Sequence, residues 1–121
     1  QFWNSLEEFN SIKDPVNINY NSWLIDYNKG GWQNIHFHRN SEFTGIWFLD
    51  VEEQQDQYGE LHLHNPNVPS YTHGLYKQVE KLRPKTDDLI IMPAWLHHSV
   101  TPTSAKRKCF VWNGFVDPVK S

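Results

Sequence analysis

The feature that most constrains the fold is a succession of short runs rich in β-branched and aromatic residues, which begins at Ile18. Clusters of Gly, Pro, Asn and Asp separate the runs, as after Lys29 and around Pro84. Such short strands with regular turns are typical of β-sandwiches and barrels. The pattern predicts strands at residues 18–27, 32–38, 43–50, 60–64, 78–83, 89–92, 98–101 and 106–116. Eight strands favour a mainly β fold of the jelly-roll class.

A helix signal stands at the start of the chain. Ser5 and Glu8 form a capping-box pattern beside the apolar residues Phe2, Leu6 and Phe9, which predicts a short N-terminal amphipathic helix. The 121 residues are enough for one domain with one core. Because the chain starts with Gln1 rather than Met, we expect a piece of a longer protein.

Composition excludes several classes of function. The longest apolar run is far shorter than the ~20 residues of a membrane span, so we expect no membrane partner. A net charge of -3 without a basic stripe argues against a nucleic-acid partner. The single cysteine, Cys109, excludes an internal disulfide framework and is compatible with the reducing cytoplasm, where we expect the protein to lie.

The predicted strand at residues 32–38 carries two of the seven histidines, His36 and His38. Side chains alternate along a strand, so these two imidazoles share a face with Asn34. Two imidazoles at this spacing can chelate one metal ion. The other interpretation is a polar strand face that lies in solvent.

A third histidine, His98, follows an apolar strand and a corner at Pro93. Alternation places His98 on the inward face with Val100, and His97 on the outward face. His98 is therefore a candidate metal ligand held by a rigid support. A core histidine bonded to the backbone is the other interpretation.

The last predicted strand places Arg107, Cys109, Val111 and Asn113 on one face. An arginine buried beside small and amide side chains could bind a carboxylate ligand through two hydrogen bonds. Alternatively, Arg107 is a surface arginine at the end of a strand.

Residues 23–116 resemble the iron(II)- and 2-oxoglutarate-dependent oxygenases, in particular a bacterial and phage-type group. The resemblance rests on Trp32-Gln33 before His36-Phe37-His38, on residues 43–49 and 88–100, and on residues 107–113. It implies one double-stranded β-helix oxygenase domain over residues 1–121 that lacks N-terminal flanking elements. It further implies Fe(II) as metal and 2-oxoglutarate as cosubstrate, with the cytoplasm of an infected bacterial host as a setting.

The resemblance also implies roles for single residues. His36 is the first metal ligand, His98 the distal ligand, and Arg107 the residue that binds the 2-oxoglutarate carboxylate. The family places Asp or Glu where this chain has His38. Either His38 ligates the metal in its stead, or a carboxylate from Glu42 or Glu60 completes the site.

Further residues are assigned to the cosubstrate pocket on the same resemblance. Asn113 or Asn34 would form a hydrogen bond near the metal, and Trp47 with Trp32 would wall the pocket. The expected reaction is hydroxylation of an unactivated C–H bond in a small molecule or peptide that the sequence does not identify. A homodimer that covers a sheet edge is a further expectation.

Two other functions compete for the same residues. The spacing of Gly30, His36, His38 and Glu42 resembles the motif of metal-binding cupins, with His98 as a later ligand. This alternative leaves Arg107 without a role. A non-catalytic jelly roll that binds carbohydrate or serves in a phage particle would need no metal. The remaining histidines, His62, His64 and His73, are expected to have no functional role; the alternatives are a second metal site at His62 and His64, and a substrate contact for His73 if its loop is a lid.

Overall fold

The computed structural model describes residues 18–116, and the strands lie close to the predicted ones. They are β1 (Ile18–Tyr27), β2 (Gln33–His36), β3 (Phe43–Val51), β4 (Leu61–His64), β5 (Val79–Leu82), β6 (Leu89–Pro93), β7 (His98–Val100) and β8 (Arg107–Val116). The mainly β prediction is confirmed. The predicted N-terminal helix lies outside the described residues.

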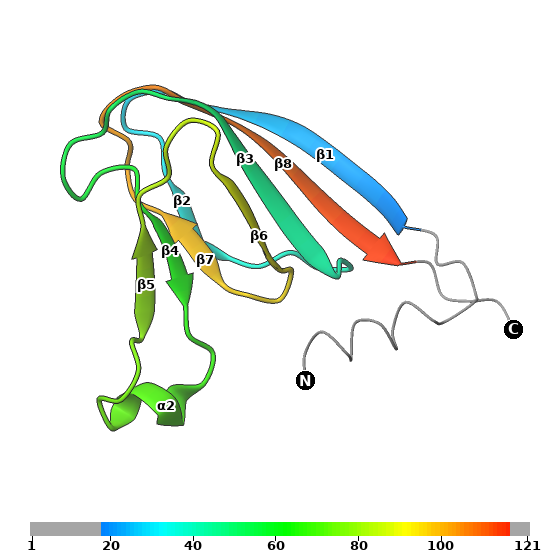
Figure 1. Cartoon of the computed structure of the whole chain (residues 1–121), viewed down its shortest axis with the longest axis vertical. Helices are drawn as coiled ribbons and strands as arrows, with labels where there is room; N and C mark the ends of the chain where they lie inside the picture. Colours follow the sequence, from blue (N-terminus) through cyan, green and yellow to red (C-terminus); the bar gives the residue numbers. More distant parts are fainter. Residues whose placement is uncertain (1–17, 117–121) are drawn as a thin grey trace, which may run out of the picture.

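The strands form two four-stranded antiparallel sheets that face one another (Figure 1). The first sheet has the order β1-β8-β3-β6 and the second β2-β7-β4-β5. Strands that are neighbours in a sheet are mostly distant in sequence, which is the arrangement of a jelly roll. The ends of the cavity between the sheets are therefore built from segments far apart in the chain.

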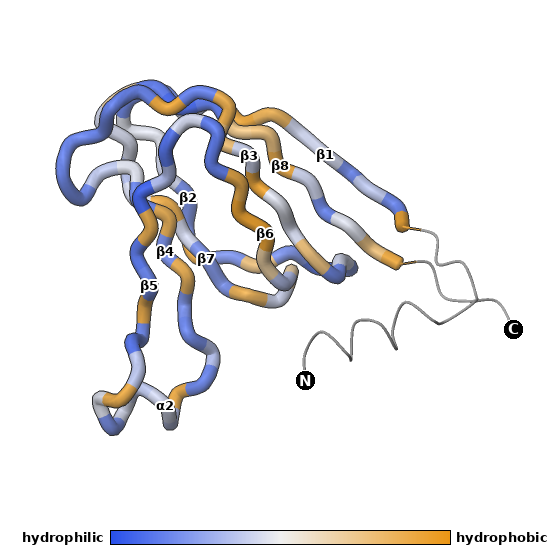
Figure 2. The backbone as a smooth tube through the Cα atoms, in the orientation of Figure 1, coloured by the Kyte–Doolittle hydropathy of each residue, from blue (hydrophilic) through white to orange (hydrophobic). Residues whose placement is uncertain are grey.

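Alternation along the strands decides what faces the interior. In β8 the residues from Arg107 to Asn113 alternate between buried and more exposed, with Arg107, Cys109, Val111 and Asn113 inward as predicted. The core includes Phe48 and Leu61, each only 1 % exposed. Figure 2 shows apolar residues concentrated on the strands, most continuously on β6, whereas the turns between strands are largely hydrophilic.

On the outer face of the first sheet, an aromatic side chain packs directly on a glycine of the neighbouring strand. Gly45 lies opposite Trp112 in the register of β3 and β8. A Cβ atom at Gly45 would lie 2.1 Å from the Trp112 ring, so the indole lies directly on the backbone. A residue larger than glycine would displace this ring and with it the sheet's outer packing.

One element departs from the predicted pattern. The segment between β4 and β5, which lies outside the predicted strands, contains the short helix α2 (Val68–Thr72), with Pro69 in its first turn. Proline is favoured there because the first N–H groups of a helix have no partner within it. β4 and β5 belong to the second sheet, and the segment that joins them, with α2, extends beyond the rest of that sheet as an arm (Figure 1). Within residues 18–116, no helix has the length and apolarity needed to cross a membrane.

Candidate metal centre and cosubstrate pocket

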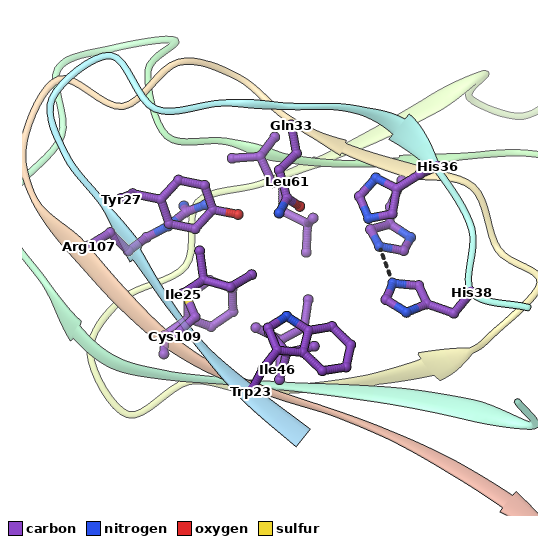
Figure 3. Close-up of a pocket in the computed structure, with 14 residues that line it drawn as sticks. Trp23, Ile25, Tyr27, Gln33, His36, His38, Ile46, Leu61, Arg107 and Cys109 are labelled. Atoms are coloured by element: carbon purple, nitrogen blue, oxygen red, sulfur yellow. Dashed lines mark hydrogen bonds between the residues drawn. The ribbon is translucent and has the colours of Figure 1, made fainter. Parts of the chain in front are cut away.

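The three histidines predicted as metal ligands come together at one end of the cavity between the sheets (Figure 3). One ring nitrogen from each of His36, His38 and His98 lies within 4.8 Å of the others. His36 and His98 are Cα partners on the adjacent strands β2 and β7, and His38 follows β2. The strand pairing therefore positions the donors before any metal binds.

Backbone carbonyl groups set the orientation of two of the rings. The Nδ1 atom of His36 lies 2.6 Å from the carbonyl oxygen of Asn34, and that of His98 lies 2.9 Å from the carbonyl oxygen of Leu96. With Nδ1 as the donor, Nε2 of each ring carries a free lone pair that can bind a metal. The Nε2 atoms of His38 and His98 are 3.3 Å apart and point toward one another.

The surroundings favour the neutral imidazoles that metal binding needs. Burial lowers the pKa of His98 to about 4, with His36, His38 and His64 acting in the same direction and the Leu96 carbonyl opposing it. Burial, then the proximity of His36, lowers the pKa of His38. Both rings are therefore unprotonated at neutral pH, since a charged imidazole would be poorly solvated there.

The two carboxylates considered as alternative ligands do not join the cluster. Glu42 is exposed, and its main chain links β3 to its neighbours through Gly114 and Ala94. The Glu60 carboxylate lies 3.1 Å from Nε2 of His62. Among the described residues the cluster consists of histidines alone, so neither Glu42 nor Glu60 takes the place of His38 in it.

Arg107 lies at the opposite end of the same cavity (Figure 3). It is only 3 % exposed, and its Nη1 donates to the carbonyl oxygen of Gly59 at 2.8 Å. Its guanidinium carbon lies 4.6 Å from the centre of the Tyr27 ring and 5.4 Å from that of Phe48. The surface-arginine interpretation is therefore wrong.

The guanidinium group has unused hydrogen-bonding capacity. Its buried Nε atom has no partner, and none of the ion pairs within residues 18–116 includes Arg107. A buried cation without a counter-ion is unfavourable. The geometry fits an anionic ligand that enters the cavity and pairs with the guanidinium group.

Tyr27 is a pocket residue that the sequence analysis missed. It lies opposite Arg107 in the register of β1 and β8, and its hydroxyl group points into the cavity (Figure 3). Burial raises the pKa of Tyr27, although nearby Arg107 acts in the opposite direction, so the hydroxyl stays protonated and can donate to an anion. Inward alternation from Trp23 through Ile25 to Tyr27 was the signal that could have identified it.

The wall between the two ends is mostly apolar. Ile25, Ile46, Leu61 and Val111 contribute to it, and so does Cys109. Burial raises the pKa of Cys109 to about 11, despite the opposing effect of Arg107. Cys109 therefore remains a neutral thiol and acts as part of the wall.

The prediction that the Asn34 side chain serves the pocket is wrong. The register of β2 against β7 shifts between Gln33 and His36, which breaks strict alternation. As a result Gln33 lines the cavity with His36, whereas Asn34 is exposed and contributes only its backbone carbonyl to the His36 ring.

The predicted wall residues Trp47 and Trp32 also lie elsewhere. Trp47 is 44 % exposed because it stands between the inward residues Ile46 and Phe48, and Trp32 is 58 % exposed. Trp23 forms this wall instead, and its ring stacks on His38 with 6.0 Å between ring centres.

Asn113 lies near the metal end, where the sequence analysis expected it. It is buried, its Oδ1 accepts a hydrogen bond from the hydroxyl of Thr44 at 2.8 Å, and its side chain acts on the pKa of His38. The structure thus gives Asn113 a place beside a candidate ligand. Its contact with a cosubstrate stays a prediction.

The other histidines lie outside the cluster. His97 is exposed and its ring contacts Phe37, at 4.8 Å between ring centres. His64 lies 3.0 Å from the hydroxyl of Ser99, and His73 is exposed next to α2. The three predicted metal ligands therefore lie together without His64, His73 or His97.

Comparison with known proteins places the chain in a family. Residues 21–113 match the family described as "Putative 2OG-Fe(II) oxygenase". No curated protein matches the chain.

Solved structures with a similar fold come from several organisms. A prolyl-4-hydroxylase of Pseudomonas putida has 14 % identity and a TM-score of 0.66, over 83 % of this chain and 54 % of that one. A 2OG-Fe(II) oxygenase family oxidoreductase of Burkholderia pseudomallei has 14 % identity and a TM-score of 0.65, over 85 % of this chain and 47 % of that one. A prolyl hydroxylase of Trichoplax adhaerens, in complex with a hypoxia inducible factor oxygen degradation domain peptide fragment, has 16 % identity and a TM-score of 0.65, over 94 % of this chain and 54 % of that one.

At these identities the similarity shows the fold alone, and the chain spans about half the length of these solved structures. The family match covers most of the chain, including all three clustered histidines and Arg107. The chain therefore belongs to the 2OG-Fe(II) oxygenase family.

Proposed function

We propose that the chain is the catalytic β-domain of an iron(II)- and 2-oxoglutarate-dependent oxygenase of the hydroxylase type. One observation carries the proposal. One cavity has three histidine nitrogen donors at one end and, at the other, a buried arginine with no counter-ion among the described residues. This pairing suits a ligand that binds a metal with one end and presents a carboxylate at the other.

The arginine end would hold the far carboxylate of 2-oxoglutarate. The buried Nε–H group of Arg107 has no partner among residues 18–116, and the Tyr27 hydroxyl points into the cavity that Arg107 also lines. Charge-assisted hydrogen bonds are roughly twice as strong as neutral ones, and the guanidinium fork matches a carboxylate. Binding would supply Arg107 with the counter-ion that it lacks.

The histidine end would hold the iron. His36, His38 and His98 offer imidazole nitrogen donors, which suit Fe(II), and three protein ligands leave positions open for other ligands. Bound there, Fe(II) supplies the redox chemistry that couples decarboxylation of 2-oxoglutarate to oxidation of a substrate C–H bond. The surrounding residues contribute by limiting access of water, since Trp23 covers His38 and the walls between the ends are apolar.

The position of Arg107 favours this function over a cupin-type metal enzyme without 2-oxoglutarate. The cupin alternative needs Glu42 as a ligand and assigns nothing to Arg107. Glu42 lies outside the histidine cluster, whereas Arg107 shares its cavity.

Anaerobic addition of Fe(II) and 2-oxoglutarate tests the proposal. We expect a visible metal-to-ligand charge-transfer band that depends on both additions and that Arg107→Ala weakens. Lys108→Ala is the matched control, because Lys108 is the exposed neighbour on the opposite face of β8. Bound iron without any such band would contradict the proposed use of 2-oxoglutarate.

A further inference from the structure

We infer that the histidine end of the cavity binds a small monoanion from solution in addition to 2-oxoglutarate. The inference rests on the proposed function and concerns the consequence of His38 for the charge of the centre. It depends on which charged groups of the described chain face the cavity.

A count of formal charges shows an imbalance. Among residues 18–116, the cavity is lined by one cationic side chain, Arg107, by the three clustered histidines, and by no carboxylate. The divalent metal and the dianionic cosubstrate cancel one another, so the guanidinium charge would remain. A set of two histidines and one carboxylate, the usual ligand set of non-haem iron oxygenases, would bring the sum to zero. Having His38 in place of the carboxylate leaves one positive charge.

Nearby acidic groups of the described chain do not compensate for this charge. Glu60 is bonded to His62, and Glu42 is exposed to water, outside the cluster. The surroundings of the centre are poorly polarisable, because Leu61, Val100 and Val111 line the cavity and Trp23 stacks on His38. Charges interact more strongly in such surroundings than in water, so an anion next to the metal is favoured.

The cavity also offers a neutral hydrogen-bond donor to an anion. The Gln33 side chain points into the space between the two ends (Figure 3). Its amide group makes no hydrogen bond to the side chains or backbone of residues 18–116 in this structure, unlike the amide groups of Gln54 and Asn65. Gln33 can therefore donate to a bound anion without losing an existing bond.

Azide is a suitable probe, with Co(II) as an oxygen-stable substitute for Fe(II). The Co(II) protein is saturated with isotope-labelled 2-oxoglutarate and titrated with sodium azide, then with sodium chloride, at constant ionic strength. We expect saturable changes in the visible absorption of Co(II) while the labelled 2-oxoglutarate stays bound in equilibrium dialysis. No spectral change, or loss of 2-oxoglutarate in step with azide binding, would overturn the inference.

Three variants distinguish an effect of charge inside the cavity from an effect of the net charge of the whole protein. His38→Asp and Gln33→Glu each add one negative charge to the cavity, and each should weaken azide binding at least tenfold. His97→Asp places an acidic side chain next to His98 in the sequence but on the exposed side, and should change azide binding less than twofold. Equal weakening by all three variants would contradict the inference.

The outcomes also distinguish this inference from the proposed function. If His38→Asp fails to bind Co(II), Gln33→Glu decides, because it keeps all three histidines. A protein that binds 2-oxoglutarate at the metal but no azide retains the proposed function and loses the inference. A protein that binds Co(II) but not 2-oxoglutarate loses the proposed function.

Discussion

The two ends of the cavity differ in how they are prepared for a ligand. At one end a permanent charge, Arg107, is buried; within the described part of the chain its Nη1 makes one hydrogen bond and its Nε has no partner. At the other end three imidazoles lie together: burial lowers the pKa of His38 and His98, and backbone carbonyl groups orient His36 and His98. The arginine end therefore carries an uncompensated charge before binding, whereas the histidine end carries unused lone pairs.

This difference has an energetic consequence. Burying an unpaired guanidinium opposes folding, so the empty arginine end lowers stability and gains most from its ligand. Neutral imidazoles cost less to bury, and their orientation is set by strand pairing. Removing a key group should thus affect stability in opposite directions at the two ends, while weakening ligand binding at both.

The largest expected effect follows removal of a metal donor. His98→Ala should weaken Fe(II) or Co(II) binding by more than ~100-fold, since even loss of an outer-shell partner costs about 10- to 100-fold. Isothermal titration calorimetry of the metal-free protein measures this. His97→Ala, at the exposed neighbouring position, should bind metal nearly as wild type does. Equal binding by both variants would remove His98 from the ligand set.

The arginine end is tested by Arg107→Met. This variant should lose roughly 2 to 5 kcal/mol of 2-oxoglutarate binding free energy, because it removes one partner of a buried charge pair. Without 2-oxoglutarate, however, its melting temperature should equal or exceed that of the wild type, since an uncompensated buried charge is gone. Calorimetry and thermal unfolding measure the two effects. A strongly destabilised variant that still binds 2-oxoglutarate would make Arg107 a structural residue.

The histidine end should make the metal-free protein sensitive to acid. Burial lowers the pKa of His98 from 6.5 to about 4, so between these values the unfolded chain binds a proton that the folded chain does not. Stability should therefore fall as the pH decreases from about 7 toward 4, by up to ~3 kcal/mol from this residue.

Urea unfolding at pH 7 and pH 5 measures this effect. His98→Gln should reduce the pH dependence, whereas His73→Gln, at an exposed position next to α2, should leave it unchanged. Identical pH dependence in wild type and His98→Gln would show that acid sensitivity has another source.

The smallest effect concerns the support of the histidine end. Thr44→Val removes the hydroxyl that donates to Oδ1 of Asn113, and leaves that buried oxygen without this partner. We expect a loss of about 1 to 3 kcal/mol of stability and only a small change in metal affinity. Chemical unfolding and metal titration measure both quantities. A larger effect on metal affinity than on stability would make Thr44 and Asn113 part of the ligand environment.

The sequence pattern was informative where strands alternate without interruption. In β8 it placed Arg107, Cys109, Val111 and Asn113 on the inward face, and the structure agrees. It failed in β2, where an irregularity in register exchanges the expected roles of Asn34 and Gln33. Strict alternation in β3 would have placed Trp47 outward, since its neighbours Ile46 and Phe48 are the apolar inward pair.

By itself, the sequence determined the strand order along the chain, the jelly-roll class and the set of histidines at metal-binding spacing. These follow from local properties, since turn residues and the two-residue period act over a few positions. Only the tertiary structure decided that Arg107 faces the histidines across one cavity, that Tyr27 and Gln33 line it, and that Glu42 stays outside. Those relations depend on which distant strands pair and in which register, and no local pattern specifies that.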